Sequence, residues 1–73
     1  MSKDIIEFSA FVLETYRFNA KLSGPEVDAL FTKYNVYDYI ADNFDVLHSF
    51  GEKRIIWEIK EYIKNQKLLL HNK

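Results

Sequence analysis

The run Ser23-Gly24-Pro25-Glu26 marks the first internal helix boundary of the chain. It has the spacing of a capping box, in which the serine hydroxyl and the glutamate carboxylate each accept the other residue's backbone N–H. Proline suits the first turn of a helix, because the N–H that it lacks would have no partner there. The run therefore predicts that a helix starts at Ser23 and that the residues before it form a separate segment.

Apolar residues on both sides of this boundary recur with the period of a helix. One stripe covers residues 3–18, and a second, rich in isoleucine, covers residues 52–70. Shorter stripes predict a helix over residues 24–34, a helix that starts at Asn35 as its N-cap, and a last turn over residues 45–50. The pattern predicts an all-α fold, a compact bundle of four to five helices of which two are long.

Gly51 marks the second boundary. It either closes one helix in a left-handed turn or lies in the first turn of the next helix. Ser49 and Glu52 also have capping-box spacing, so the start of the last helix stays open by about two residues. We expect the following side chains around and after this boundary to face the core: Val46, Leu47, Phe50, Ile55, Ile56, Ile59, Tyr62, Ile63, Leu69 and Leu70.

Length and composition limit the class of protein. The 73 residues suffice for one helical domain, residues 1–73, with a frayed tail at about 69–73. The chain has no cysteine, which excludes disulfides and thiolate metal sites. No apolar run approaches the roughly 20 residues of a membrane span, and the first residues do not resemble a signal peptide. We expect a soluble, cytoplasmic protein without a membrane partner.

The charges divide along the chain. Residues 23–51 contain five acidic residues and one lysine, whereas residues 52–73 contain six basic residues and three acidic ones. An acidic middle and a basic last helix favour internal pairing or head-to-tail association over nucleic-acid binding.

Candidate catalytic and metal-binding residues are few. His48 follows Asp45 by three positions, but no nucleophile or oxyanion donor is near it in the sequence. A structural role at a helix end suits His48 better, because an imidazole can contact the last helix carbonyls. A metal site needs three or four ligands, and His71 is the only other histidine. We expect no catalytic residue, no metal, no cofactor and no small-molecule ligand, and hence no enzyme.

A DNA-binding regulator is the alternative reading. Two short helices that meet near Asn35 could form a helix-turn-helix, but the second carries Asp38, Asp42 and Asp45 and no basic residue. Carboxylates facing phosphates would be repelled. The basic residues of the last helix, among them Lys60, are the other route to DNA, and we expect nucleic-acid binding to be the weaker hypothesis.

Apolar residues outside the core stripes indicate an interaction surface. On the last helix Trp57 points nearly opposite to the isoleucine stripe, and Leu68 lies close to the same direction. On the first helix Phe11 and Phe18 form a second patch at the edge of the stripe. Tryptophan is enriched in protein–protein interfaces. These four residues are the predicted contact surface for a protein partner or for a second copy in a homodimer.

The motifs Leu22-Ser23-Gly24 and Leu47-His48-Ser49-Phe50-Gly51, the latter followed by an Ile-rich helix, also point to a family. With them the chain resembles the small bacterial family called domain of unknown function 3791, which has a Leu-His-x-x-Gly signature. The resemblance covers residues 4–64 and departs from the family at Pro25 and in the tail after Ile63.

The resemblance implies a compact bacterial helical domain. Members are often encoded near ADP-ribosyltransferase-like proteins, which implies an antitoxin-like role or regulation of a partner. It brings no catalytic residues, and it implies structural roles for the matched motif residues: Ser23, Gly24, Leu47, His48 and Gly51.

Overall fold

The fold consists of five helices in the computed structural model, which describes residues 2–71 and the side chains of residues 2–70. No strand occurs within these residues. The all-α bundle expected from the periodicity is confirmed. The helices are α1 (Lys3–Ala20), α2 (Gly24–Lys33), α3 (Val36–Asp42), α4 (Phe44–Leu47) and α5 (Glu52–His71).

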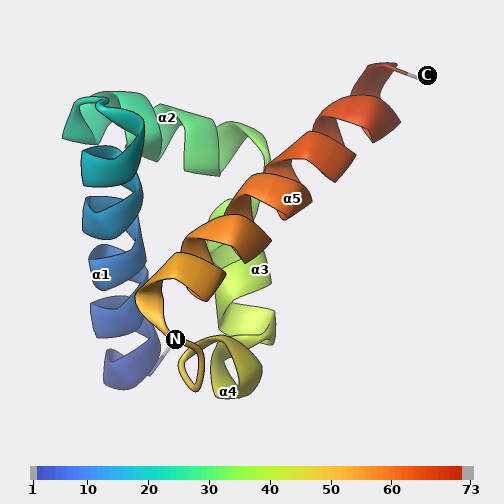
Figure 1. Cartoon of the computed structure of the whole chain (residues 1–73). Helices are drawn as coiled ribbons and strands as arrows, with labels where there is room; N and C mark the ends of the chain where they lie inside the picture. Colours follow the sequence, from blue (N-terminus) through green and yellow to red (C-terminus); the bar gives the residue numbers. More distant parts are fainter. Residues whose placement is uncertain (1, 72–73) are drawn as a thin grey trace.

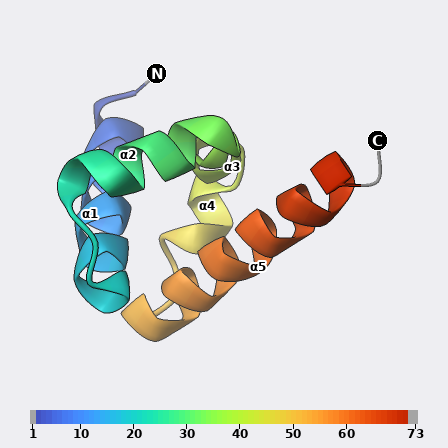
Figure 2. The same cartoon turned by 90° about the horizontal axis from the view of Figure 1, so that it is seen from above.

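The two long helices, α1 and α5, contact each other and the shorter helices. Figure 1 shows α2 crossing from the end of α1 toward α3, while α5 runs diagonally past the other helices. α1 contacts α2, α3 and α5, and α3 contacts α5. Figures 1 and 2 both show the last turns of α5 extending away from the rest of the molecule, whose principal extents are 35 × 25 × 22 Å.

The capping box at Ser23 is present. The Ser23 hydroxyl accepts the backbone N–H of Glu26 at 3.2 Å, and the Glu26 carboxylate accepts the backbone N–H of Ser23 at 3.1 Å. The bond from the Ser23 N–H is the main reason why the pKa of Glu26 lies below its usual value. Both bonds satisfy N–H groups that a helix start leaves without partners. The predicted start of α2 is therefore confirmed.

Two other helix ends depend on left-handed backbone. Lys21 ends α1 at φ 58°, and its N–H donates to the carbonyl of Arg17. Asn35, which precedes α3, also has φ 58°, and its side chain makes no capping bond. The predicted N-cap position of Asn35 is confirmed, and its carbonyl accepts the first helical hydrogen bond, from the N–H of Tyr39 at 3.2 Å. Asparagine tolerates this conformation better than most residues.

The structure decides the boundary at Gly51. The Ser49 hydroxyl donates to the carbonyl of Val46 at 2.6 Å and does not cap the next helix. Gly51 directly precedes α5, its carbonyl accepts the N–H of Ile55 at 3.0 Å, and its φ is not positive. The left-handed alternative for Gly51 is therefore wrong, and α5 begins at Glu52.

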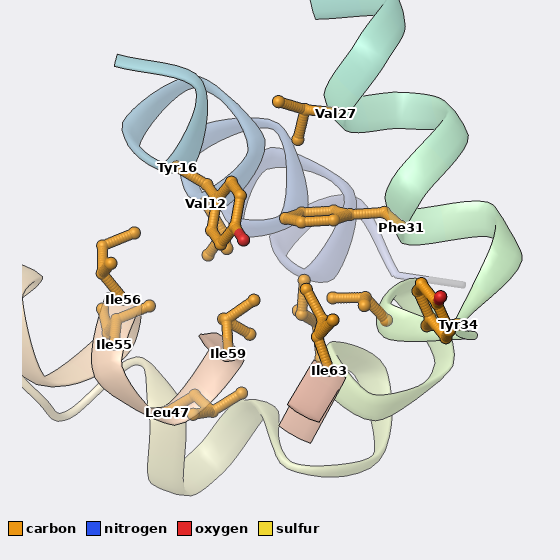
Figure 3. Packing of buried hydrophobic residues seen from close by; sticks show 12 residues of the cluster. Val12, Tyr16, Val27, Phe31, Tyr34, Leu47, Ile55, Ile56, Ile59 and Ile63 are labelled. Atoms are coloured by element: carbon orange, nitrogen blue, oxygen red, sulfur yellow. The ribbon is translucent and has the colours of Figure 1, made fainter. Parts of the chain in front are cut away.

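The core is built around Phe31 of α2, which is fully buried. Its ring makes edge-to-face contacts with Tyr16 at 5.3 Å and with Tyr37 at 5.5 Å between centroids. Figure 3 shows Ile59 and Ile63 of α5 facing this ring from the other side of the core. The predicted inward stripes of α1, α2 and α5 meet here, and the buried apolar residues are Val12, Tyr16, Val27, Phe31, Tyr34, Val36, Ile40, Leu47, Ile55, Ile56, Ile59 and Ile63.

Three residues expected in the core are exposed. Val46 is 56% exposed, because α4 is a single turn and only Leu47 of that turn reaches the core. Leu69 and Leu70 continue the isoleucine stripe of α5, but no other helix lies beside them (Figure 1). Residues 69–71, expected to fray, are helical, and the rest of that predicted tail, residues 72–73, lies outside the described residues.

Replacing the capping serine tests the first boundary. Ser23→Ala removes the acceptor for the Glu26 N–H, so we expect the free energy of unfolding to fall by about 1 kcal/mol. Thermal unfolding followed by circular dichroism should show a midpoint lower by roughly 4–8 °C. Thr32→Ala is the control, because Thr32 is an exposed residue of the same helix. Equal midpoints for the two variants would contradict the capping role.

The same box predicts an acid-sensitive contribution to stability. The pKa of Glu26 is lower in the folded chain than its ordinary value of 4.5, so its stabilising effect is complete above pH 4.5 and is lost as pH falls through the lowered pKa. Glu26→Gln should therefore weaken the acid dependence of unfolding below pH 4.5, measured by urea titration at several pH values. An unchanged acid dependence would exclude this contribution.

Candidate interaction groove

A groove of about 800 Å³ lies between the C-terminal half of α1 and the first half of α5. Six residues of α1 and five residues of α5 line it, and we call it the α1/α5 groove. It exists because each long helix turns one face to the core and leaves a second face outward. On α1 the buried face contains Val12 and Tyr16, and on α5 it contains Ile55 and Ile59.

Three of the four predicted contact residues line this groove. Phe11 and Phe18 come from α1, two turns apart, and Trp57 comes from α5. Their exposed fractions are 45% for Phe11, 81% for Phe18 and 55% for Trp57. The two apolar patches that appear separate in the sequence therefore form one surface.

The indole ring of Trp57 has a cationic neighbour on its own helix. The Arg54 guanidinium lies 5.5 Å from the centroid of this ring and 4.7 Å from that of Phe50. Arg54 is itself held by Glu58, whose carboxylate accepts its Nε–H at 2.8 Å. A cation over an aromatic face is attracted by the ring. One side of the indole is thus supported from within the chain, while more than half of its surface stays open.

The fourth predicted residue, Leu68, lies in an adjacent hollow of about 400 Å³. Lys60 lines both spaces, so the hollow continues the groove toward the end of α5. Tyr16 contributes from α1, and burial raises the pKa of its phenol. The four predicted residues therefore lie along one extended surface, with Leu68 at its far end.

The net positive charge of this surface comes from its lysines. Lys53 and Lys60 line the groove, and Lys60, Lys64 and Lys67 line the adjacent hollow. Across residues 2–70, none of these four lysines lies within ion-pair distance of a carboxylate. The Lys67 ammonium lies 5.8 Å from the centroid of the Tyr34 ring. The second half of the surface is therefore basic as well as apolar.

The single arginine of the groove is already neutralised. Arg17 donates from Nε at 2.9 Å and from Nη2 at 2.6 Å to the carboxylate of Glu14, one turn earlier on α1. The hydrogen bond from Arg17 holds the pKa of Glu14 below its usual value. This pair leaves Glu52 as the other acidic residue of the lining.

His48 has a local structural contact. Its Nδ1 lies 2.6 Å from the carbonyl oxygen of Phe44, and because a carbonyl can only accept, Nδ1 carries the proton. The imidazole also stacks on the Phe44 ring at 4.4 Å and meets the Phe8 ring edge-on at 6.4 Å. This contact closes the single turn of α4. Asp45, three positions before His48, is not the group that holds Nδ1.

Two of the four remaining family-motif residues make structural contacts. Leu47 is buried in the core, and Ser23 caps α2. A Cβ atom added to Gly24 or to Gly51 would have no atom within 4 Å, and neither glycine has a positive φ. The backbone thus requires glycine at neither position.

Among the described residues, no three side chains of the metal-binding types lie close enough to share an ion. None of the described helices has the length and hydropathy that a membrane span requires.

The fold and the groove define a small all-α protein with an open apolar and basic surface between its two long helices. The sequence matches the family described as "Protein of unknown function (DUF3791)" over residues 7–66, and the chain belongs to this family. The resemblance inferred from the motifs is thereby confirmed. A search of curated proteins and a search of solved structures returned no match.

Sequence reasoning missed the residues that complete the groove. Ile56 is part of the buried isoleucine stripe and also lines the groove. Lys53 and Lys60 lie one turn to either side of Trp57, so the helical period of α5 could have grouped them with it. No sequence pattern could have paired them with Thr15 and Asn19 of α1.

The exposure of Trp57 predicts a distinctive fluorescence. Trp57 is the only tryptophan, so the emission should be close to that of a solvated indole. Iodide should quench it more strongly than caesium at low ionic strength, because Lys53 and Lys60 line the same groove and attract anions. Lys53→Gln combined with Lys60→Gln should reduce this difference. A blue-shifted emission that neither ion quenches would contradict the exposed position.

Proposed function

We propose that this protein is a small helical interaction module that binds another protein through the α1/α5 groove. The observation that carries the proposal is the convergence of Phe11, Phe18 and Trp57, all exposed, on one groove from two helices. Large exposed apolar patches rimmed by polar residues are typical of protein interfaces. Aromatic residues dominate the binding energy of many such surfaces.

The distribution of exposed apolar residues supports this site over others. Eight large apolar side chains are exposed among the described residues, and four of them lie along the groove and its adjacent hollow. Of the other four, Ile6 and Val46 stand singly on α1 and α4. Scattered single residues need no explanation, whereas a continuous row calls for one.

The proposed role is regulation of that partner by binding, without catalysis by this chain. The family resemblance supports a more specific version, in which the chain is the antitoxin-like half of a pair beside an ADP-ribosyltransferase-like protein. A cytoplasmic site of action fits the absence of cysteine, because a reducing compartment does not favour disulfides.

A DNA-binding regulator is the second candidate, favoured by the four lysines of α5 that lack ion pairs within residues 2–70. Phosphate contacts dominate DNA affinity and make it strongly dependent on salt. Here the apolar side chains of Trp57 and Leu68 lie between the lysines. This mixture of apolar and basic groups suits an amphipathic partner better than a phosphate backbone. A fluorescence titration with duplex DNA at rising salt separates the two: a steep loss of affinity supports the regulator.

Substitutions in the groove test the interaction module. Trp57→Ala and Phe18→Ala should each weaken capture of a specific partner at least about tenfold, the loss that corresponds to about 1.4 kcal/mol of interface energy. The measurement is affinity purification of the tagged chain from its native cell, followed by titration of the captured protein. Ile6→Ala and Val46→Ala are matched controls, because both residues are apolar, exposed and outside the groove.

The variants are suitable because the residues do not support the core. Phe18 is the most exposed large apolar residue among those described, so its removal should leave thermal unfolding unchanged. Partner capture that survives both groove substitutions, or that is lost equally with the controls, would exclude the groove as the binding surface.

A further inference from the structure

We infer that the occupant of the α1/α5 groove is an acidic amphipathic α-helix of a different protein. The inference rests on the proposed function and adds the shape and charge of the partner. Three observations carry it. They are the length of the surface along α5, its excess of positive charge, and the lack of a complementary surface on a second copy of the chain.

The surface has the dimensions of a helix-binding groove. Its α5 side extends from Glu52 to Leu68, which is about 24 Å at 1.5 Å per residue. A partner helix of about 16 residues covers that length. The lining residues of α5 recur at three- and four-residue intervals and so form one continuous stripe: Lys53, Ile56, Trp57, Lys60, Ile63, Lys64, Lys67 and Leu68.

The order of side chains on this stripe determines which positions of the partner helix are apolar. Apolar groups at Trp57, Ile63 and Leu68 alternate with the lysines along α5, and Phe11 and Phe18 of α1 line the same groove as Trp57. A helix recognised by such a groove presents apolar residues at positions i, i+3 or i+4, and i+7. The flanks of that apolar row then lie beside the lysines.

The charge of the surface favours an acidic partner. Five basic residues and two acidic ones line the groove and its adjacent hollow, an excess of three positive charges. Glu14 is occupied by Arg17, and Lys60, Lys64 and Lys67 are held by no carboxylate of residues 2–70. Complementary charges across an interface select the right partner and speed association, and like charges reject the wrong one.

A second copy of the chain does not fit as a symmetric partner. In a two-fold dimer the same surface contributes from both sides. Joining two copies through this groove would bring together two surfaces that each carry an excess of three positive charges. Such like-charge contacts are unfavourable in an interface.

The acidic region of a second copy does not fit either. Residues 23–51 carry five acidic residues, but Val46 is their only exposed large apolar side chain. Asp28 in this region already accepts a hydrogen bond from the Tyr37 hydroxyl at 2.6 Å. This region therefore lacks the apolar row that the groove needs, and the complementary helix belongs to another protein.

A helix library tests the charge preference directly. Helices of 16 residues are displayed on yeast with leucine fixed at positions spaced three and four apart and with glutamate, lysine, glutamine or alanine at random elsewhere. The labelled 73-residue chain is the probe, and sorting is done at low and at moderate salt. We expect sorted clones with net negative charge to outnumber those with net positive charge at least tenfold, with a smaller ratio at higher salt.

Charge reversal supplies the matched comparison. The triple variant Lys60→Glu, Lys64→Glu, Lys67→Glu should invert the preference, so that lysine-rich helices are selected. The control triple Lys3→Glu, Lys21→Glu, Lys33→Glu changes the total charge by the same amount at exposed lysines outside the groove, and it should keep the acidic preference. Trp57→Ala should reduce sorting of all clones at least tenfold.

Four results would overturn the inference. Two concern the library: equal selection of acidic and basic helices, and no selection above the Trp57→Ala background. The other two are binding of the probe to yeast that display the chain itself, and displacement of sorted helices by duplex DNA at submicromolar concentration. The first leaves the proposed function intact, because helices would still bind the groove. Failure of the proposed function shows separately, as partner capture that survives Trp57→Ala and Phe18→Ala.

Discussion

The burial of the isoleucine face of α5 against α1 and α3, opposite Phe31 of α2, is the contact on which the rest of the molecule depends. A chain of 73 residues buries only roughly 60% of its unfolded surface, and here no disulfide adds to its stability. Ile59 is fully buried and faces the ring of Phe31 across the core (Figure 3). Because this one face of α5 closes the core, the position of α5 also determines where its outward face lies.

The interaction surface is a consequence of that packing. Once Ile55 and Ile59 point into the core, the helical period places Trp57 and Lys60 on the outside. α1 is held in the same way by Val12 and Tyr16, which leaves Phe11 and Phe18 at the edge that faces α5. One set of contacts therefore stabilises the fold and shapes the groove. A groove built from two helices fixed by a common core has a defined width before any partner arrives, which lowers the entropic cost of binding.

Local chemistry explains which features could be predicted. The capping box at Ser23 depends on four consecutive residues, and it forms as predicted. The single turn of α4 could not be predicted in the same way. The positions of α3 and α5 decide which side chains of this turn reach the core. As a result, Val46 faces outward and Leu47 faces inward. Asn35 follows the same rule, since its left-handed backbone is set by the way α3 folds back on α2. The apolar stripe of α5 continues to Leu69, as the helical period predicts, but no neighbouring helix covers this residue.

The sequence by itself determined the helices, the capping box, the inward faces of α1, α2 and α5, the family, and the identity of the apolar residues left over. These follow from periodicity and hydrogen bonding over a few neighbouring residues. Only the tertiary structure decided that Phe11, Phe18 and Trp57 share one groove, that Leu68 continues it, and that the lysines of α5 line it. The physical reason is that α1 and α5 are more than 30 residues apart in the chain, and their relative position is set by the packing of the whole core around Phe31.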